Sequence, residues 1–101
     1  MNEVEEVGMT LASTNGLLPQ EHVVFTEFDA GEGILVDLNT KKYFQLNETG
    51  MIVWRGLEKG QTLEEIVSQI TAAYDVTAEH AAASVGKLLD SLRAFKLVRP
   101  A

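Results

Sequence analysis

Two histidines and a pair of adjacent carboxylates are the side chains that could do metal or acid–base chemistry in this chain. His22 and His80 are far apart in the sequence, whereas a metal site built on one helix needs histidines at i and i+4 or a His-x-x-Glu spacing. Glu64 and Glu65 are neighbours, and neighbouring side chains on a helix diverge, so they cannot share a proton or a substrate atom. The sequence therefore predicts neither a metal site nor a carboxylate pair for catalysis.

The sequence contains no pattern typical of nucleophilic catalysis or of phosphate binding. The serines considered as nucleophiles are Ser13, Ser68, Ser84 and Ser91. None of them has a plausible base and orienting acid in a recognisable nucleophile elbow. Gly31 and Gly33 lie between two expected strands, not directly before a helix N-terminus that could cradle a phosphate. The chain contains no cysteine, which excludes a thiolate nucleophile. We therefore expect no catalytic residue, no cofactor and no enzymatic activity.

Length and charge narrow the class of protein further. A chain of 101 residues with 46% hydrophobic residues is expected to form one domain with one core. Fifteen acidic and eight basic residues give a net charge of −7, which argues against a nucleic-acid partner because such binding needs clustered Lys and Arg. The N-terminus carries glutamates where a secretory signal carries positive charge, and no apolar run could span a bilayer. We expect a cytoplasmic protein without a membrane partner.

The residue pattern changes from strand-like to helix-like near the middle of the chain. Residues 1–20 show no sustained period and are predicted to be a flexible tail, which leaves residues 21–101 as the folded domain. Alternating side chains then predict an antiparallel meander. Its three strands are expected at 22–29, 34–38 and 42–46.

Three helices are expected after the strands. Asn47, Thr62 and Thr77 are suitable N-caps, and Glu65 completes a capping box with Thr62. The apolar stripe of the last helix is predicted to contain Ala81, Val85, Leu88, Leu89, Leu92 and Phe95. Three strands followed by three helices define an α+β domain in which the helices cover one face of the sheet.

The third strand, residues 42–46, can leave one edge open. An open edge can bind an extended peptide by strand addition. Lysines also protect edges against unwanted pairing, and Lys41 and Lys42 could do only that. The last helix carries more apolar residues than a narrow core stripe needs, because Leu88 and Leu89 are about 100° apart around its axis. Most of these residues are expected to be core, and one side of the stripe could form an apolar floor beside the edge.

Two runs of this sequence resemble the PqqD-like proteins, also called RiPP recognition elements. The runs are "ILVDLNTKKYFQLNETGMIVW" and "TLEEIVSQITAAYDVTAEHAAASVGKLLDSLRAFKLV". The resemblance covers roughly residues 22–98. Its most telling parts are the hairpin ending in Tyr43-Phe44-Gln45-Leu46-Asn47, the Trp54 helix, the Tyr74-Asp75-Val76 step and the final Leu-rich helix.

This resemblance implies a winged-helix-like fold and a non-catalytic peptide chaperone. Such a protein captures the leader of a ribosomal precursor peptide by strand addition and presents it to a modifying enzyme, either a leader protease, as in lasso-peptide pathways, or a radical SAM enzyme, as in quinone-cofactor synthesis. The implied peptide-binding residues are Lys42, Tyr43, Phe44, Gln45 and Leu46 on the strand and, from helical periodicity, Val85, Leu88, Leu89 and Leu92 on the helix.

Other classes of protein share the expected fold, so the fold alone does not decide the function. The main alternative is a winged-helix DNA-binding regulator, although the final helix offers only the basic pair Arg93 and Lys96. An obligate subunit that docks a partner through its apolar surface is a further alternative.

Overall fold

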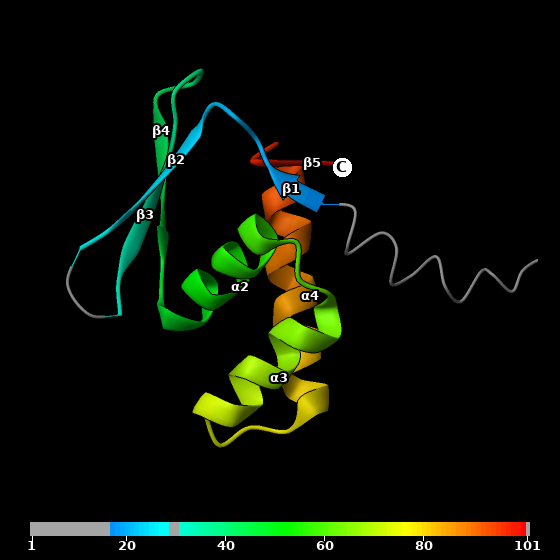
Figure 1. Ribbon diagram of the computed structural model, residues 1–101. Helices are drawn as coiled ribbons and strands as arrows, with labels where there is room; N and C mark the ends of the chain where they lie inside the picture. The colour runs from blue at the N-terminus through cyan, green and yellow to red at the C-terminus, as the bar shows by residue number, and fades with distance from the viewer. Residues whose placement is uncertain (1–16, 29–30, 101) are drawn as a thin grey trace, which may run out of the picture.

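Three antiparallel strands form the sheet that the alternating sequence pattern predicts. The computed structural model describes residues 17–28 and 31–100. Its three-stranded sheet has the order β2-β3-β4 (Figure 1). The strands are β2 (Val23–Glu27), β3 (Gly33–Asp37) and β4 (Lys42–Leu46). Leu35, in the central strand, lies opposite Phe25 of β2 and Phe44 of β4. The expected meander is therefore confirmed, and residue 29 of the expected first strand lies outside the described residues.

The two faces of this sheet differ in polarity and burial. Leu35 is fully buried, and its cross-strand neighbours Phe25 and Phe44 pack against the core. Side chains one position along point to the opposite face, where Val24 and Tyr43 are exposed. The helices thus cover one face of the sheet (Figure 1).

The three expected helices begin at the predicted caps. They are α2 (Glu48–Lys59), α3 (Leu63–Ala73) and α4 (Ala78–Ala94). The Asn47 side chain accepts a hydrogen bond from the Gly50 amide at 2.8 Å, with no intervening loop between β4 and α2. Thr62 forms a capping box with Glu65, and Thr77 caps α4. The α+β class, with a three-stranded antiparallel sheet followed by three helices, is confirmed.

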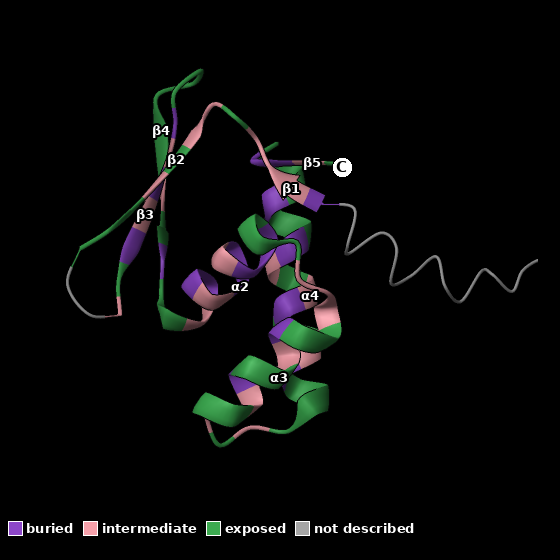
Figure 2. Cartoon of the chain, in the orientation of Figure 1, coloured by how far each residue is buried: buried purple, intermediate pink, exposed green. Residues whose placement is uncertain are grey.

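One hydrophobic core joins the sheet to all three helices (Figure 2). Trp54 of α2 is only 1% exposed. The same cluster contains Leu35 of β3, Ile66 of α3 and Val85 of α4. Because the same cluster holds residues from each element, the position of α4 relative to β4 is fixed by core packing.

A second, two-stranded sheet was not expected from the sequence. β1 (Leu17–Pro19) pairs antiparallel with β5 (Val98–Pro100). Leu17 and Val98 are buried in the core cluster. Most of the predicted tail, residues 1–20, lies outside the described residues, and the boundary at residue 20 stays a prediction. The structure does place 17–19 in a strand, because the chain end supplies a partner that local sequence does not reveal.

Two helical glycines have opposite surroundings and allow a matched prediction. A Cβ atom at Gly56 would lie 2.6 Å from Ile66 Cγ1, whereas one at Gly86 would meet no atom within 4 Å. We expect Gly56→Ala to lower the free energy of unfolding by about 1–3 kcal/mol through overpacking. Gly86→Ala should raise it by up to about 1 kcal/mol because alanine favours the helix. Urea denaturation of both variants checks this, and equal shifts of the two midpoints would contradict it.

Candidate functional site

The outer edge of β4 is the first feature of the candidate site. β4 is the last strand in the sheet order β2-β3-β4, and no strand within residues 17–28 and 31–100 pairs with its other side. Alternate backbone amides and carbonyls of an edge strand are free to bind another extended chain. Lys42, Tyr43 and Gln45 are exposed on this strand, Phe44 is half-buried and Leu46 is buried. The free backbone groups of this edge therefore lie between two faces of β4, one with exposed side chains and one with apolar side chains directed toward the core.

α4 runs alongside β4 in the opposite direction. At one end, the ring centroids of Phe44 and Phe95 are 4.9 Å apart. At the other end, Leu46 and Leu88 line the same cavity. The chain therefore brings a helix next to the open edge, although no sequence motif connects the two.

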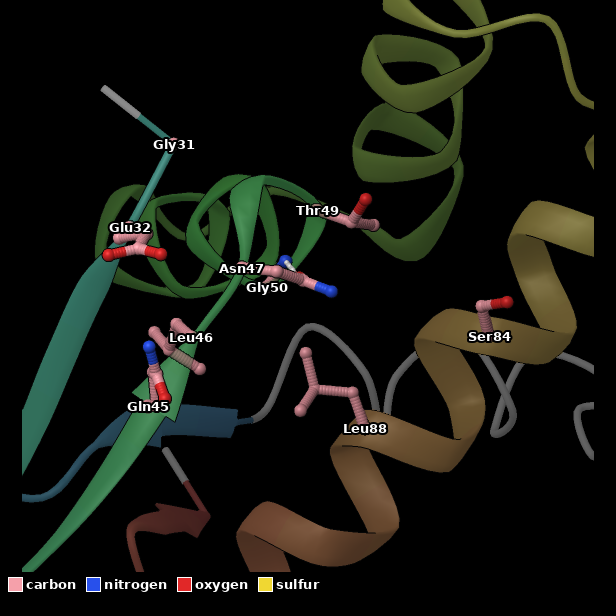
Figure 3. Close-up of a pocket in the computed structure, with 9 residues that line it drawn as sticks. All are labelled: Gly31, Glu32, Gln45, Leu46, Asn47, Thr49, Gly50, Ser84 and Leu88. Carbon is pink, nitrogen blue, oxygen red and sulfur yellow. Dashed lines mark hydrogen bonds between the residues drawn. The ribbon is translucent and has the colours of Figure 1, made fainter. Parts of the chain in front are cut away.

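A cavity of about 570 Å³ lies between the end of β4 and α4 (Figure 3). Gln45 and Leu46 come from the strand, and Ser84 and Leu88 from the helix. The rest of its lining comes from the turn before β3 and the start of α2, and consists of Gly31, Glu32, Asn47, Thr49 and Gly50. Figure 3 shows the Leu88 side chain extending from α4 toward the strand side. We call this cavity, together with the β4 edge, the groove.

The helix-side residues that periodicity suggested are mostly core residues. Val85, Leu89 and Leu92 are buried to 4% exposure or less and belong to the core cluster, so only Leu88 of the four lines the groove. Their stripe faces the sheet and the other helices, because it forms the most apolar side of α4.

Sequence reasoning identified only Leu88 of a neighbouring row on α4 and its C-cap, whose residues follow one another at spacings of four, three and four. The row is Ser84, Leu88, Ser91 and Phe95. Ser84 and Leu88 line the groove, and Phe95 contacts Phe44 of the strand. Phe95 is 54% exposed. The sequence feature that could have predicted this row is its helical spacing next to the core stripe, together with its two apolar residues, Leu88 and Phe95.

A smaller cavity of about 180 Å³ adjoins the groove and shares Thr49 and Ser84 with it. Most of its remaining lining is apolar and includes Ile70, Val76 and Ala81. Tyr74 also lines it. The apolar lining makes this cavity suited to a single apolar side chain.

The Tyr74 hydroxyl joins the end of α3 to the start of α2. It donates a hydrogen bond of 2.8 Å to Glu48 Oε1. This bond to the carboxylate, together with desolvation and the negative charge of Glu48, raises the pKa of Tyr74 above its ordinary value. Tyr74 therefore keeps its proton at neutral pH and holds one wall of the smaller cavity in place.

Asp37 organises the hairpin that carries the open edge. Its carboxylate is 4% exposed and accepts hydrogen bonds from the backbone amides of Asn39 and Thr40, at 2.9 and 3.2 Å. Desolvation alone raises the pKa of Asp37, but these bonds and the nearby His22 outweigh it, so the pKa lies below its ordinary value. His22 Nε2 is 3.7 Å from Asp37 Oδ1. In the described part of the chain, no three potential metal ligands come together.

The lowered pKa of Asp37 gives a pH prediction. A carboxylate whose pKa is depressed by folding stabilises the fold above its unfolded pKa, and that contribution is lost as the pH falls through the folded pKa. Asp37→Asn keeps an acceptor for the two turn amides but removes the charge. We therefore expect the urea midpoint of Asp37→Asn to fall less between pH 7 and pH 3 than that of the unsubstituted chain. Parallel loss in both proteins would contradict the assignment.

The fold and groove define a class: small α+β, winged-helix-like domains with a helix beside an open edge strand. A sequence model of the family described as "Coenzyme PQQ synthesis protein D (PqqD)" matches residues 32–98. The chain belongs to the PqqD family, as the sequence resemblance suggested. No curated protein sequence matches this chain. In the described residues, no helix is long and apolar enough to cross a membrane.

Two solved structures resemble most of this chain. One is described as "TbiB1 in Complex with the TbiA(beta) Leader Peptide"; it is 32% identical, with a TM-score of 0.74, covering 81% of this chain and 94% of its own. The other is "Lasso peptide synthetase B1 complexed with the leader peptide", at 26% identity and a TM-score of 0.73, covering 84% and 99%. The similarity thus extends beyond the region matched by the family.

Proposed function

We propose that this protein binds the leader of a ribosomal precursor peptide by adding it as a strand to β4. The open edge beside α4, with the groove between them, is the observation that carries the proposal. Both similar solved structures are complexes with a leader peptide, and they cover most of this chain, which supports the same class of ligand here.

Affinity in this arrangement comes from two sources. Backbone groups of residues 42–46 bind the peptide main chain, which is tolerant of sequence. Side chains then set specificity. Leu88 and Leu46 offer apolar contacts in the groove, and the smaller cavity can hold one apolar anchor of the peptide. Ordering a flexible peptide costs free energy, so these few anchors decide the affinity.

The remaining predicted binding residues have different roles in this proposal. Val85, Leu89 and Leu92 hold α4 at its distance from β4, since they are core residues. Lys42, Tyr43 and Gln45 have exposed side chains and contribute mainly through their backbone. Phe44 contacts Phe95 and can add an aromatic contact at the far end of the groove.

We further propose that the protein is a non-catalytic chaperone of the cytoplasm. It would deliver the bound leader to a modifying enzyme of its pathway, which is a leader protease or a radical SAM enzyme. The similarity to a lasso peptide synthetase B1 supports the first of these partners. No feature of the described residues favours the DNA-binding alternative, because the exposed surface of α4 mixes Glu79 and Asp90 with Lys87 and Arg93.

Amide NMR shifts test the proposal directly. The labelled protein is titrated with a synthetic leader from the precursor gene that lies nearest to the gene of this chain. We expect shifts to cluster on residues 42–46, on 84–95 and on the start of α2. A scrambled peptide of the same composition is the control. Absence of shifts, or equal shifts with the scrambled peptide, would overturn leader binding at this groove.

A further inference from the structure

The two ends of the groove differ in the charge of the residues around them. Because α4 and β4 run in opposite directions, the C-terminal end of α4 lies near the start of β4. Figure 1 shows β4 running from the tip of the β3–β4 hairpin to the start of α2, and α4 running in the opposite direction, with its C-terminal end on the side of the hairpin tip. Phe44 and Phe95 mark the first end. Leu46 and Ser84 mark the second end, where the cavity lies. Any extended peptide in the groove must therefore pass from one end to the other.

The hairpin end is basic. Lys41 lies in the hairpin turn and Lys42 begins β4, while Lys96 directly follows Phe95. All three lysines are exposed. The one carboxylate of the hairpin, Asp37, is buried and bonded to turn amides. A peptide bound at this end would therefore lie next to a net positive charge.

The cavity end is acidic. Glu32 lines the groove, and Figure 3 shows its carboxylate at the start of β3, beside the end of β4. Glu48 Oε2 would lie 2.8 Å from a Cβ atom at Gly31, which also lines the groove. Glu48 meets the Tyr74 hydroxyl, a neutral partner. One carboxylate, Glu32, thus lines this end, and a second, Glu48, lies beside the lining residue Gly31.

These charges are not neutralised by ion pairs within residues 17–28 and 31–100. The side-chain contacts between basic and acidic residues found there join His22 to Asp37 and Arg55 to Glu27. None of the three lysines or two glutamates that flank the groove takes part. An electrostatic potential that changes sign along the groove is therefore available to orient a charged partner.

We infer that the groove selects a leader segment whose N-terminal flank is basic and whose C-terminal flank is acidic, bound antiparallel to β4. This inference rests on the proposed function. The sheet is antiparallel throughout, and antiparallel pairing is slightly more stable than parallel pairing. An antiparallel guest strand places its N-terminal flank at Glu32 and Glu48 and its C-terminal flank at Lys41, Lys42 and Lys96. Charge complementarity then fixes both the direction and the register of the peptide.

The test uses two versions of the leader from the nearest precursor gene. Both keep its apolar β-pairing segment. One carries two lysines before the segment and two glutamates after it, and the other carries the same residues exchanged. Affinities are measured by calorimetry at about 10 mM and about 1 M salt, where the screening lengths are about 30 and 3 Å. We expect the first peptide to bind about tenfold more tightly at low salt and the difference to vanish at high salt.

A charge-exchanged protein provides the matched control. Glu32→Lys with Lys42→Glu keeps the net charge of the protein. Because Glu48, Lys41 and Lys96 remain, this exchange should remove most of the preference between the two peptides without reversing it. Glu58→Lys with Lys59→Glu exchanges two exposed charges at the end of α2 and should leave the preference unchanged. A preference that is undiminished after the exchange of Glu32 and Lys42 would overturn the inference.

A nitroxide label on the peptide shows in which direction the peptide is bound, because it broadens the amide signals of nearby residues. This measurement does not depend on the affinity. A label at the N-terminus should broaden the amide signals of Glu32, Asn47 and Ser84, and one at the C-terminus those of Lys42 and Lys96. The reverse pattern would overturn the antiparallel assignment. Equal affinities of the two peptides would overturn the charge selection alone, with leader binding intact. If neither peptide binds, the proposed function fails and the inference fails with it.

Discussion

Trp54→Ala is expected to lower the free energy of unfolding by about 3–5 kcal/mol, as observed when large aromatic side chains are removed from cores. Trp54 is 1% exposed and belongs to the cluster that joins the sheet to the helices. The free energy of unfolding of a small domain is only about 5–15 kcal/mol. This variant should therefore unfold at urea concentrations well below the midpoint of the parent protein. Far-UV circular dichroism is the appropriate readout because the substitution removes the only tryptophan.

Two further variants separate packing from other effects of this substitution. Trp54→Phe should cost less than Trp54→Ala, because it keeps an aromatic ring and removes an indole N–H that has no hydrogen-bond partner among the described residues. Tyr43→Ala removes an aromatic side chain that is 72% exposed and should change stability by less than about 0.5 kcal/mol. A loss of under about 1 kcal/mol for Trp54→Ala would mean that the core is not organised around this residue.

Leu88→Asp is expected to weaken leader binding by about 10- to 100-fold, which corresponds to about 1.4–3 kcal/mol. Leu88 is half-buried and is the one predicted helix-side residue that lines the groove. The substitution removes an apolar contact and places a carboxylate where the peptide must lie. Fluorescence anisotropy with a labelled leader peptide measures the change in affinity.

The controls for Leu88→Asp must separate binding from folding. Ala83→Asp adds the same charge to an exposed position of α4 that does not line the groove, and it should leave affinity nearly unchanged. Lys42→Glu should have a smaller effect than Leu88→Asp, because its side chain is exposed at the strand edge. Equal affinity of the leader for all three variants would remove Leu88 from the binding site.

Val85→Asp, by contrast, is a test of folding. From sequence periodicity alone, Val85 and Leu88 were equivalent candidates for the peptide-binding face. In the structure Val85 is 1% exposed within the core, so a charge there is expected to unfold the domain. The distinction depends on which side of α4 faces the sheet, and helical spacing does not specify that side.

Elements with local signals could be predicted from the order of the residues. Asn47, Thr62 and Thr77 begin helices because their side chains accept hydrogen bonds from the first free amides of the chain that follows. The alternation in residues 34–46 predicted β3 and β4 because strand side chains point to opposite faces in turn. Composition and net charge predicted one small acidic domain. The resemblance carried by residues 22–98 indicated the family.

Features that depend on contacts between distant segments could not be predicted in this way and became visible in the folded chain. The pairing of β1 with β5 joins the two ends of the described chain, and neither short strand has an alternating pattern long enough to be recognised. The row of Ser84, Leu88 and Phe95 became a groove wall because core packing turned the neighbouring stripe toward the sheet. The charge at the hairpin end of the groove likewise depends on the packing of α4, because its direction antiparallel to β4 brings Lys96 to the end that carries Lys41 and Lys42.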